Sequence, residues 1–101
     1  MNLPDGVSEQ QMRDLCGRYQ IQKLAIFGSI LDDAQWHDTA DVDLLVEFAA
    51  DAPLSLFKLG TIQGELTDIF KRLIDLRTRA TLNSELHKRI HEFVTIYERE
   101  G

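Results

Sequence analysis

Hydrophobic residues recur at the three- and four-residue intervals of a helix in three parts of the chain, and in shorter runs between them. The first helical pattern covers residues 9–19. Ser8 and Gln11 precede and open it with the spacing of a capping box, in which each side chain bonds the other residue's backbone amide. The pattern therefore predicts a first helix over residues 9–19. Its apolar positions are Met12, Leu15, Cys16 and Tyr19.

Two further helices are expected in the second half of the chain. One follows Pro53, which suits the first turn of a helix. The other is capped by Asn83 or Ser84 and is expected to continue through Tyr97. The apolar positions of the earlier helix are Leu56, Leu59, Ile62, Leu66, Ile69, Phe70 and Leu73, and those of the later one are Leu86, Ile90, Phe93, Val94 and Tyr97.

Three shorter runs between the helical patterns predict strands. Residues 22–27 are apolar on both faces, which indicates a central strand covered on two sides. Residues 40–48 alternate, with Val42, Leu44, Val46 and Phe48 on one face. Residues 73–77 form the third strand. The order predicts an α/β (α+β) fold, a small mixed sheet with helices packed on it.

Length and composition set limits on what the protein does. The 101 residues suit a single domain over residues 1–101, and no apolar run is long enough to span a bilayer. The N-terminus lacks the features of a signal peptide and there is one cysteine, so a cytoplasmic protein without membrane attachment is expected. A net charge of −6 argues against direct binding of nucleic acid, which needs a basic surface.

Two aspartates at the start of the second strand are the first candidates for chemistry. Asp41 and Asp43 are two residues apart, so a strand directs both carboxylates to the same face. Like charges held that close repel each other. A divalent cation removes this repulsion, and Mg²⁺ commonly binds one or two carboxylates together with substrate phosphates. The pair therefore indicates a metal site.

Asp75 lies between aliphatic residues in the third strand, where a charge is costly unless it is paired. Two interpretations remain open from the residues. In the first, the strand lies at the sheet edge and Asp75 forms a salt bridge with Arg77. In the second, Asp75 is a third metal ligand beside Asp41 and Asp43.

Gly28 and Ser29 end the first strand and precede a segment that could form a short helix. Glycine allows another group to approach the backbone closely, and free amides at a helix start attract anions. The Ser29 hydroxyl adds a further donor. These two residues are therefore candidates for binding the phosphates of a nucleotide.

Taken together, Gly28-Ser29, the Asp-x-Asp at Asp41 and Asp43, and the later Asp75 resemble the minimal nucleotidyltransferase domain of the DNA polymerase beta superfamily. The resemblance extends from about Leu24 to Tyr97. It implies a nucleotidyltransferase fold and transfer of a nucleotidyl group from ATP or another nucleoside triphosphate, with Mg²⁺, or Mn²⁺, as cofactor. It further implies that Asp41, Asp43 and Asp75 bind metal and act in catalysis, while Gly28 and Ser29 bind nucleotide.

The resemblance also suggests a partner. Small domains of this type are often antitoxins of HEPN-type toxins, and members of the family transfer AMP from ATP to a hydroxyl of the toxin. Two features depart from the family pattern. Eleven residues instead of the usual ten separate Ser29 from Asp41, and Asp32 or Asp33 stands where an arginine is common. They motivate an alternative, a catalytically degenerate module that neutralises or scaffolds its partner. A third hypothesis, an acidic domain whose aspartates are incidental, ranks last.

Overall fold

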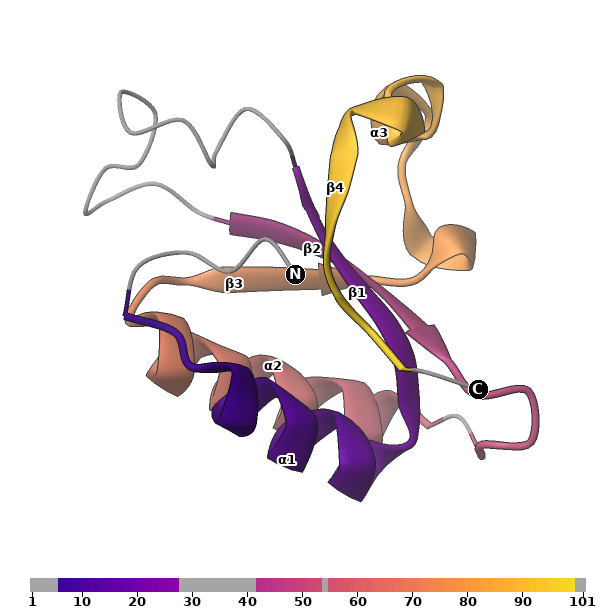
Figure 1. The fold of residues 1–101 in the computed structure, drawn as a ribbon. Helices are drawn as coiled ribbons and strands as arrows, with labels where there is room; N and C mark the ends of the chain where they lie inside the picture. The colour runs from indigo at the N-terminus through magenta and orange to yellow at the C-terminus, as the bar shows by residue number, and fades with distance from the viewer. Residues whose placement is uncertain (1–5, 28–41, 54, 100–101) are drawn as a thin grey trace.

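A computed structural model describes residues 6–27, 42–53 and 55–99 (Figure 1). Its centre is a four-stranded mixed sheet with the strand order β3-β2-β1-β4. Strand β1 pairs antiparallel with both β2 and β4, whereas β2 and β3 are parallel. The elements are α1 (Glu9–Tyr19), β1 (Ile21–Phe27), β2 (Val42–Phe48), α2 (Leu56–Phe70), β3 (Ile74–Arg77), η3 (Arg79–Thr81), α3 (Ser84–Lys88), η4 (Ile90–Glu92) and β4 (Phe93–Glu98).

Helices α1 and α2 lie together on one face of the sheet (Figure 1). The predicted capping box at the start of α1 is confirmed, since the Ser8 side chain accepts from the Gln11 amide and Gln11 accepts from the Ser8 amide. Helix α2 begins at Leu56 with Ser55 as its cap, so the placement of Pro53 in its first turn was wrong. An oxygen atom on the Ser55 side chain can cap the Lys58 amide, which proline cannot do.

The main core lies between these helices and the sheet. Because strand side chains alternate, every second residue of β2 points into this core, as the pattern predicted. Glu65 of α2 also joins the two helices, because it accepts from the Tyr19 hydroxyl and forms an ion pair with Arg18. The largest fully buried side chains are Met12, Leu15, Ile21, Leu24, Ile26, Leu44, Ile62, Leu66, Ile96, Val42, Val46 and Cys16.

The prediction of a final helix through Tyr97 was wrong. Helix α3 spans only Ser84–Lys88, and Phe93–Glu98 forms β4 beside β1. The sequence Phe-Val-Thr-Ile-Tyr explains the difference, because β-branched and aromatic residues favour the pleated surface of a sheet. Apolar residues at 90, 93, 94 and 97 also fit a helical period, so periodicity alone was ambiguous. β4 is what makes β1 a central strand, as expected.

The opposite face of the sheet carries a smaller apolar cluster. Ala25, Leu45 and Leu82 are buried there. Side chains from the α3–β4 segment pack against them: Leu86, Ile90 and Phe93. Asp43 alternates with the core residues of β2 and therefore belongs to this second face.

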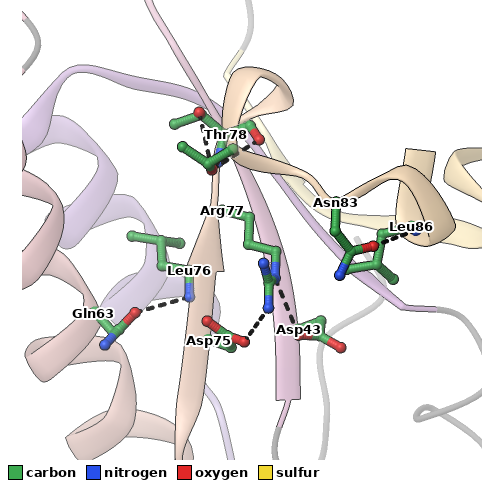
Figure 2. Close-up of polar contacts among 9 residues, drawn as sticks. Asp43, Gln63, Asp75, Leu76, Arg77, Thr78, Asn83 and Leu86 are labelled. Atoms are coloured by element: carbon green, nitrogen blue, oxygen red, sulfur yellow. Dashed lines mark hydrogen bonds and ion pairs between the residues drawn. The ribbon is translucent and has the colours of Figure 1, made fainter.

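Strand β3 is the edge of the sheet beside β2, and α2 covers its free side. The Leu76 amide donates to Gln63 Oε1 at 3.0 Å (Figure 2). The Ile74 amide donates to Thr67 Oγ1 at 3.3 Å. Unpaired strand edges are prone to pair with other chains. These two side chains therefore satisfy edge amides and fix β3 against α2. None of the helices in the described ranges has the length and apolarity needed to cross a membrane.

Candidate active site

The sheet brings Asp43 and Asp75 together on the face opposite the main core. Asp43 of β2 is the register partner of Asp75 in β3, between the pairs Val42–Ile74 and Leu44–Leu76. Register partners in neighbouring strands project to the same side of a sheet. Figure 2 shows both carboxylates beside the guanidinium of Arg77, two residues after Asp75.

Arg77 contacts both carboxylates. Its Nη2 lies 2.5 Å from Asp75 Oδ2, and its Nε lies 3.5 Å from Asp43 Oδ1. The first contact is a charge-assisted hydrogen bond. The second is an ion pair without hydrogen-bond alignment, since the buried Nε has no hydrogen-bond partner among the described residues. One guanidinium therefore contacts two carboxylates, with a hydrogen bond to Asp75 and a longer ion pair to Asp43.

The electrostatic environment of Asp43 favours its neutral form. Burial is the main cause that raises the pKa of Asp43, and repulsion from the Asp75 carboxylate raises this pKa further. The positive charge of Arg77 lowers the pKa of Asp43 but does not cancel the rise. The site thus resists two full negative charges, which is the condition that a bound cation would relieve.

The arrangement is consistent with both interpretations of Asp75. β3 is an edge strand and Asp75 is paired with Arg77, as the salt-bridge interpretation expected. Asp75 also shares a face with Asp43, as a metal site requires. Asp41, Gly28 and Ser29 lie outside the described residues, as do Asp32 and Asp33. Within the described ranges, no three His, Cys, Asp or Glu side chains form a group that could hold a metal.

The contact between Arg77 and Asp43 was not anticipated from the sequence. Arg77 was considered only as a partner of Asp75. Its spacing of two from Asp75 did place the two side chains on one strand face. The spacing does not reveal that Asp43, on the neighbouring strand, lies within reach of the same guanidinium.

Glu47 lies further along β2 and forms a separate ion pair with Arg79, whose Nε lies 2.8 Å from Glu47 Oε1.

Comparison of the sequence with known protein families identifies the family of this chain. Residues 8–97 match the family described as nucleotidyltransferase domain, which is nearly the whole chain. This chain belongs to that family. The match includes both β2 and β3, so the strands that present Asp43 and Asp75 are part of the shared domain.

Two archaeal relatives from Methanocaldococcus jannaschii align with most of this nucleotidyltransferase-family chain. "Putative protein adenylyltransferase MJ0126" is 29% identical over 91 residues, which cover 90% of this chain and 90% of that protein. "Putative protein adenylyltransferase MJ1217" is 31% identical over 80 residues, which cover 79% of this chain and 79% of that protein.

Solved structures support the nucleotidyltransferase fold of the chain. A crystal structure of a toxin–antitoxin with AMP-PNP matches with a TM-score of 0.67 at 16% identity, covering 93% of this chain and 76% of that chain. A complex of the tri-AMPylated HEPN toxin of Shewanella oneidensis with its MNT antitoxin matches with a TM-score of 0.56 at 17% identity, covering 90% of this chain and 70% of that chain.

Proposed function

We propose that this protein transfers AMP from ATP to a hydroxyl of a partner protein. The observation that carries the proposal is the register pairing of Asp43 with Asp75, which sets two carboxylates side by side on one face of the sheet of a nucleotidyltransferase domain. The names of the two archaeal relatives, protein adenylyltransferases, support the same reaction class.

The donor set suits a hard divalent cation, Mg²⁺ or Mn²⁺. Asp43 and Asp75 offer oxygen ligands, and Asp41 would be the third carboxylate. When bound, such a cation supplies charge stabilisation to the attacking and leaving oxygens. Gly28 and Ser29 would bind the triphosphate through backbone amides and the serine hydroxyl.

The transfer breaks a phosphoanhydride bond of ATP and forms a phosphate ester to the acceptor. The acceptor hydroxyl oxygen attacks the α-phosphorus of ATP, and the bond from the α-phosphorus to the bridging oxygen breaks. Pyrophosphate leaves with the bonding electron pair. Asp75 is proposed to accept the proton of the hydroxyl, because it is the more exposed of the two described carboxylates, 47% against 33% for Asp43. The rate gain comes from positioning and electrostatics.

A HEPN-type toxin is the proposed acceptor. The matched structures include toxin–antitoxin complexes, one of them holding a HEPN toxin that carries AMP. In this proposal, the chain supplies the nucleotide site and the partner supplies the hydroxyl.

The competing function is a binding module that neutralises its partner without chemistry. Asp32, in the place of a common arginine, favours it, because an acidic side chain near a triphosphate weakens nucleotide binding. The two functions differ in one measurement. Purified protein is incubated with ATP labelled at the α-phosphate, Mg²⁺ and a co-purified HEPN-type partner.

Catalysis predicts label on the partner that is lost with Asp43→Asn and kept with Asp51→Asn, a matched change at an exposed turn residue. A binding module predicts a stable complex and no label with any variant. Label that persists in Asp43→Asn would remove Asp43 from the mechanism and overturn the proposed site.

A further inference from the structure

We propose that Arg77 is an internal counter-ion that holds Asp43 and Asp75 in the metal-free protein and must be displaced when a divalent cation binds them. This inference deepens the proposed function and takes from it the nature of the cation. It assigns to Arg77 a positioning role that the two carboxylates alone do not reveal.

The contacts of Arg77 support the counter-ion role. Its guanidinium reaches both carboxylates from the same strand face, with Nη2 on Asp75 Oδ2 at 2.5 Å and Nε 3.5 Å from Asp43 Oδ1 (Figure 2). The Arg77 side chain is 25% exposed, less than either carboxylate. A positive charge in this position offsets the repulsion between two neighbouring carboxylates.

The same contacts place the guanidinium in competition with a metal ion. Arg77 engages one oxygen of each carboxylate, Asp75 Oδ2 and Asp43 Oδ1. A Mg²⁺ lies about 2.0–2.1 Å from its ligand oxygens, so an ion held by this pair would lie close to the guanidinium. Two cations within a few ångströms also repel each other. This repulsion sets the guanidinium and the metal ion in competition for Asp43 and Asp75.

Arg77 contacts Asp43 more weakly than Asp75, which makes its displacement feasible. The Nε group is buried, yet it has no aligned hydrogen bond to Asp43 or to any other described residue. An unsatisfied buried donor is unfavourable, so this half of the contact adds little to hold the arginine in place. Displacement would mainly break the hydrogen bond to Asp75.

Competition of this kind lowers the apparent affinity for metal by the fraction of time that the site is free. If Arg77 occupies the pair for about nine-tenths of the time, the apparent Kd for metal is about tenfold weaker than the intrinsic value. Removal of the guanidinium should recover that factor. A purely structural arginine, or one that helps to hold the metal, predicts no gain or a loss.

The test measures binding of Mn²⁺ by electron paramagnetic resonance of the free ion, without nucleotide, in the full chain. Arg77→Gln should tighten the apparent Kd about tenfold, and Arg77→Lys should tighten it less, because a lysine retains the charge but has no fork to span both carboxylates. The matched control is Arg79→Gln. It makes the same change in net charge but removes a side chain that pairs with Glu47, so its Kd should stay at the wild-type value.

An unchanged or weaker Kd in Arg77→Gln overturns the inference, and so does equal tightening in Arg79→Gln, which would reflect net charge alone. Absence of Mn²⁺ binding in both wild type and Arg77→Gln also overturns it. Should Arg77→Gln not fold, the Arg77→Lys and Arg79→Gln pair carries the same comparison. Tightening in a protein that transfers no AMP would support the inference while the proposed catalysis fails. AMP transfer by the wild type, with no tightening of the Mn²⁺ Kd in Arg77→Gln, would support the proposed catalysis while this inference fails.

Discussion

Asp43 and Asp75 are register partners on the parallel strands β2 and β3, and this relationship places their side chains on the sheet face away from α1 and α2. The pairing is set by the packing of apolar residues on the other face. Val42, Leu44 and Ile74 are buried in the main core, so Asp43 and Asp75 must project to the opposite side. A core made of aliphatic side chains thus fixes the geometry of the polar site.

The first prediction concerns stabilisation by metal. Mg²⁺ that binds the folded protein should raise its Tm, with about 2.7 kcal/mol of added stability at a concentration of 100 times Kd. For a domain of this size, that corresponds to roughly 10 °C or more. Asp43→Asn should lose this shift, because it removes a charged ligand.

Differential scanning fluorimetry with and without Mg²⁺ measures the effect, with Asp51→Asn as the variant that should keep it. Asp51 is an exposed turn residue and lies in no predicted ligand set. A full shift in Asp43→Asn would place the ion elsewhere.

The second prediction concerns pH in the absence of metal. The folded state raises the pKa of Asp43, mainly through burial, so the folded protein binds a proton more readily at this position than the unfolded chain does. The contribution of Asp43 to stability is therefore highest below the ordinary aspartate pKa of about 3.9, and it falls as pH rises toward the raised value. Asp43→Asn, which cannot ionise, should not show this loss.

Urea unfolding of wild type and Asp43→Asn in EDTA across pH 4–7 isolates the effect. The stability of the wild type relative to the variant should decline with rising pH and then level off. Parallel curves would mean that Asp43 has the same pKa in both states.

The third prediction compares two leucines of one helix. Leu66 of α2 is fully buried in the main core, whereas Leu56 is 82% exposed. Leu66→Ala should cost about 2–5 kcal/mol, through lost burial and a cavity. Leu56→Ala should change stability by less than about 0.5 kcal/mol. Chemical denaturation of both variants tests the assignment of the α2 face, and equal losses would contradict it.

The sequence predicted most of this fold because local patterns agreed with packing. Strand β2 alternates cleanly, and α1 carries its own capping box, so each could be recognised without tertiary information. The segment containing β4 failed that test. Its apolar residues satisfy both periods, and only pairing with β1 selects the strand.

In the candidate site too, features set by local sequence were predicted and features set by tertiary packing were not. Asp43 was identified as a candidate from residue type and its spacing from Asp41, which are local properties. For Asp75 the residues left two interpretations open, and the family resemblance favoured the metal ligand. The contact of Arg77 with Asp43 depends on the register between β2 and β3, and register follows from the way α2 crosses between these strands and packs. No local pattern encodes that distance, so only the three-dimensional structure reveals that one arginine serves both carboxylates.

The last prediction concerns Asp32. This prediction rests on the sequence alone, because Asp32 lies outside the described residues. The family resemblance implies an arginine at Asp32 or at nearby Asp33, and the negative charge of Asp32 should oppose a triphosphate bound after Gly28 and Ser29. Two charges a few ångströms apart in a partly solvated site interact by about 1–4 kcal/mol. Asp32→Arg converts repulsion into attraction, so the affinity for Mg-ATP should rise by roughly tenfold or more.

Calorimetric titration of Mg-ATP into wild type and Asp32→Arg measures this gain, and Asp33→Arg makes the same charge change one residue further on. If position 32 faces the phosphates, Asp32→Arg should gain more than Asp33→Arg, and both gains should shrink as added salt screens the charges. Equal affinities in wild type and Asp32→Arg would show that position 32 does not sense the phosphates. The eleven-residue segment between Ser29 and Asp41 would then be the feature that separates this site from its family pattern.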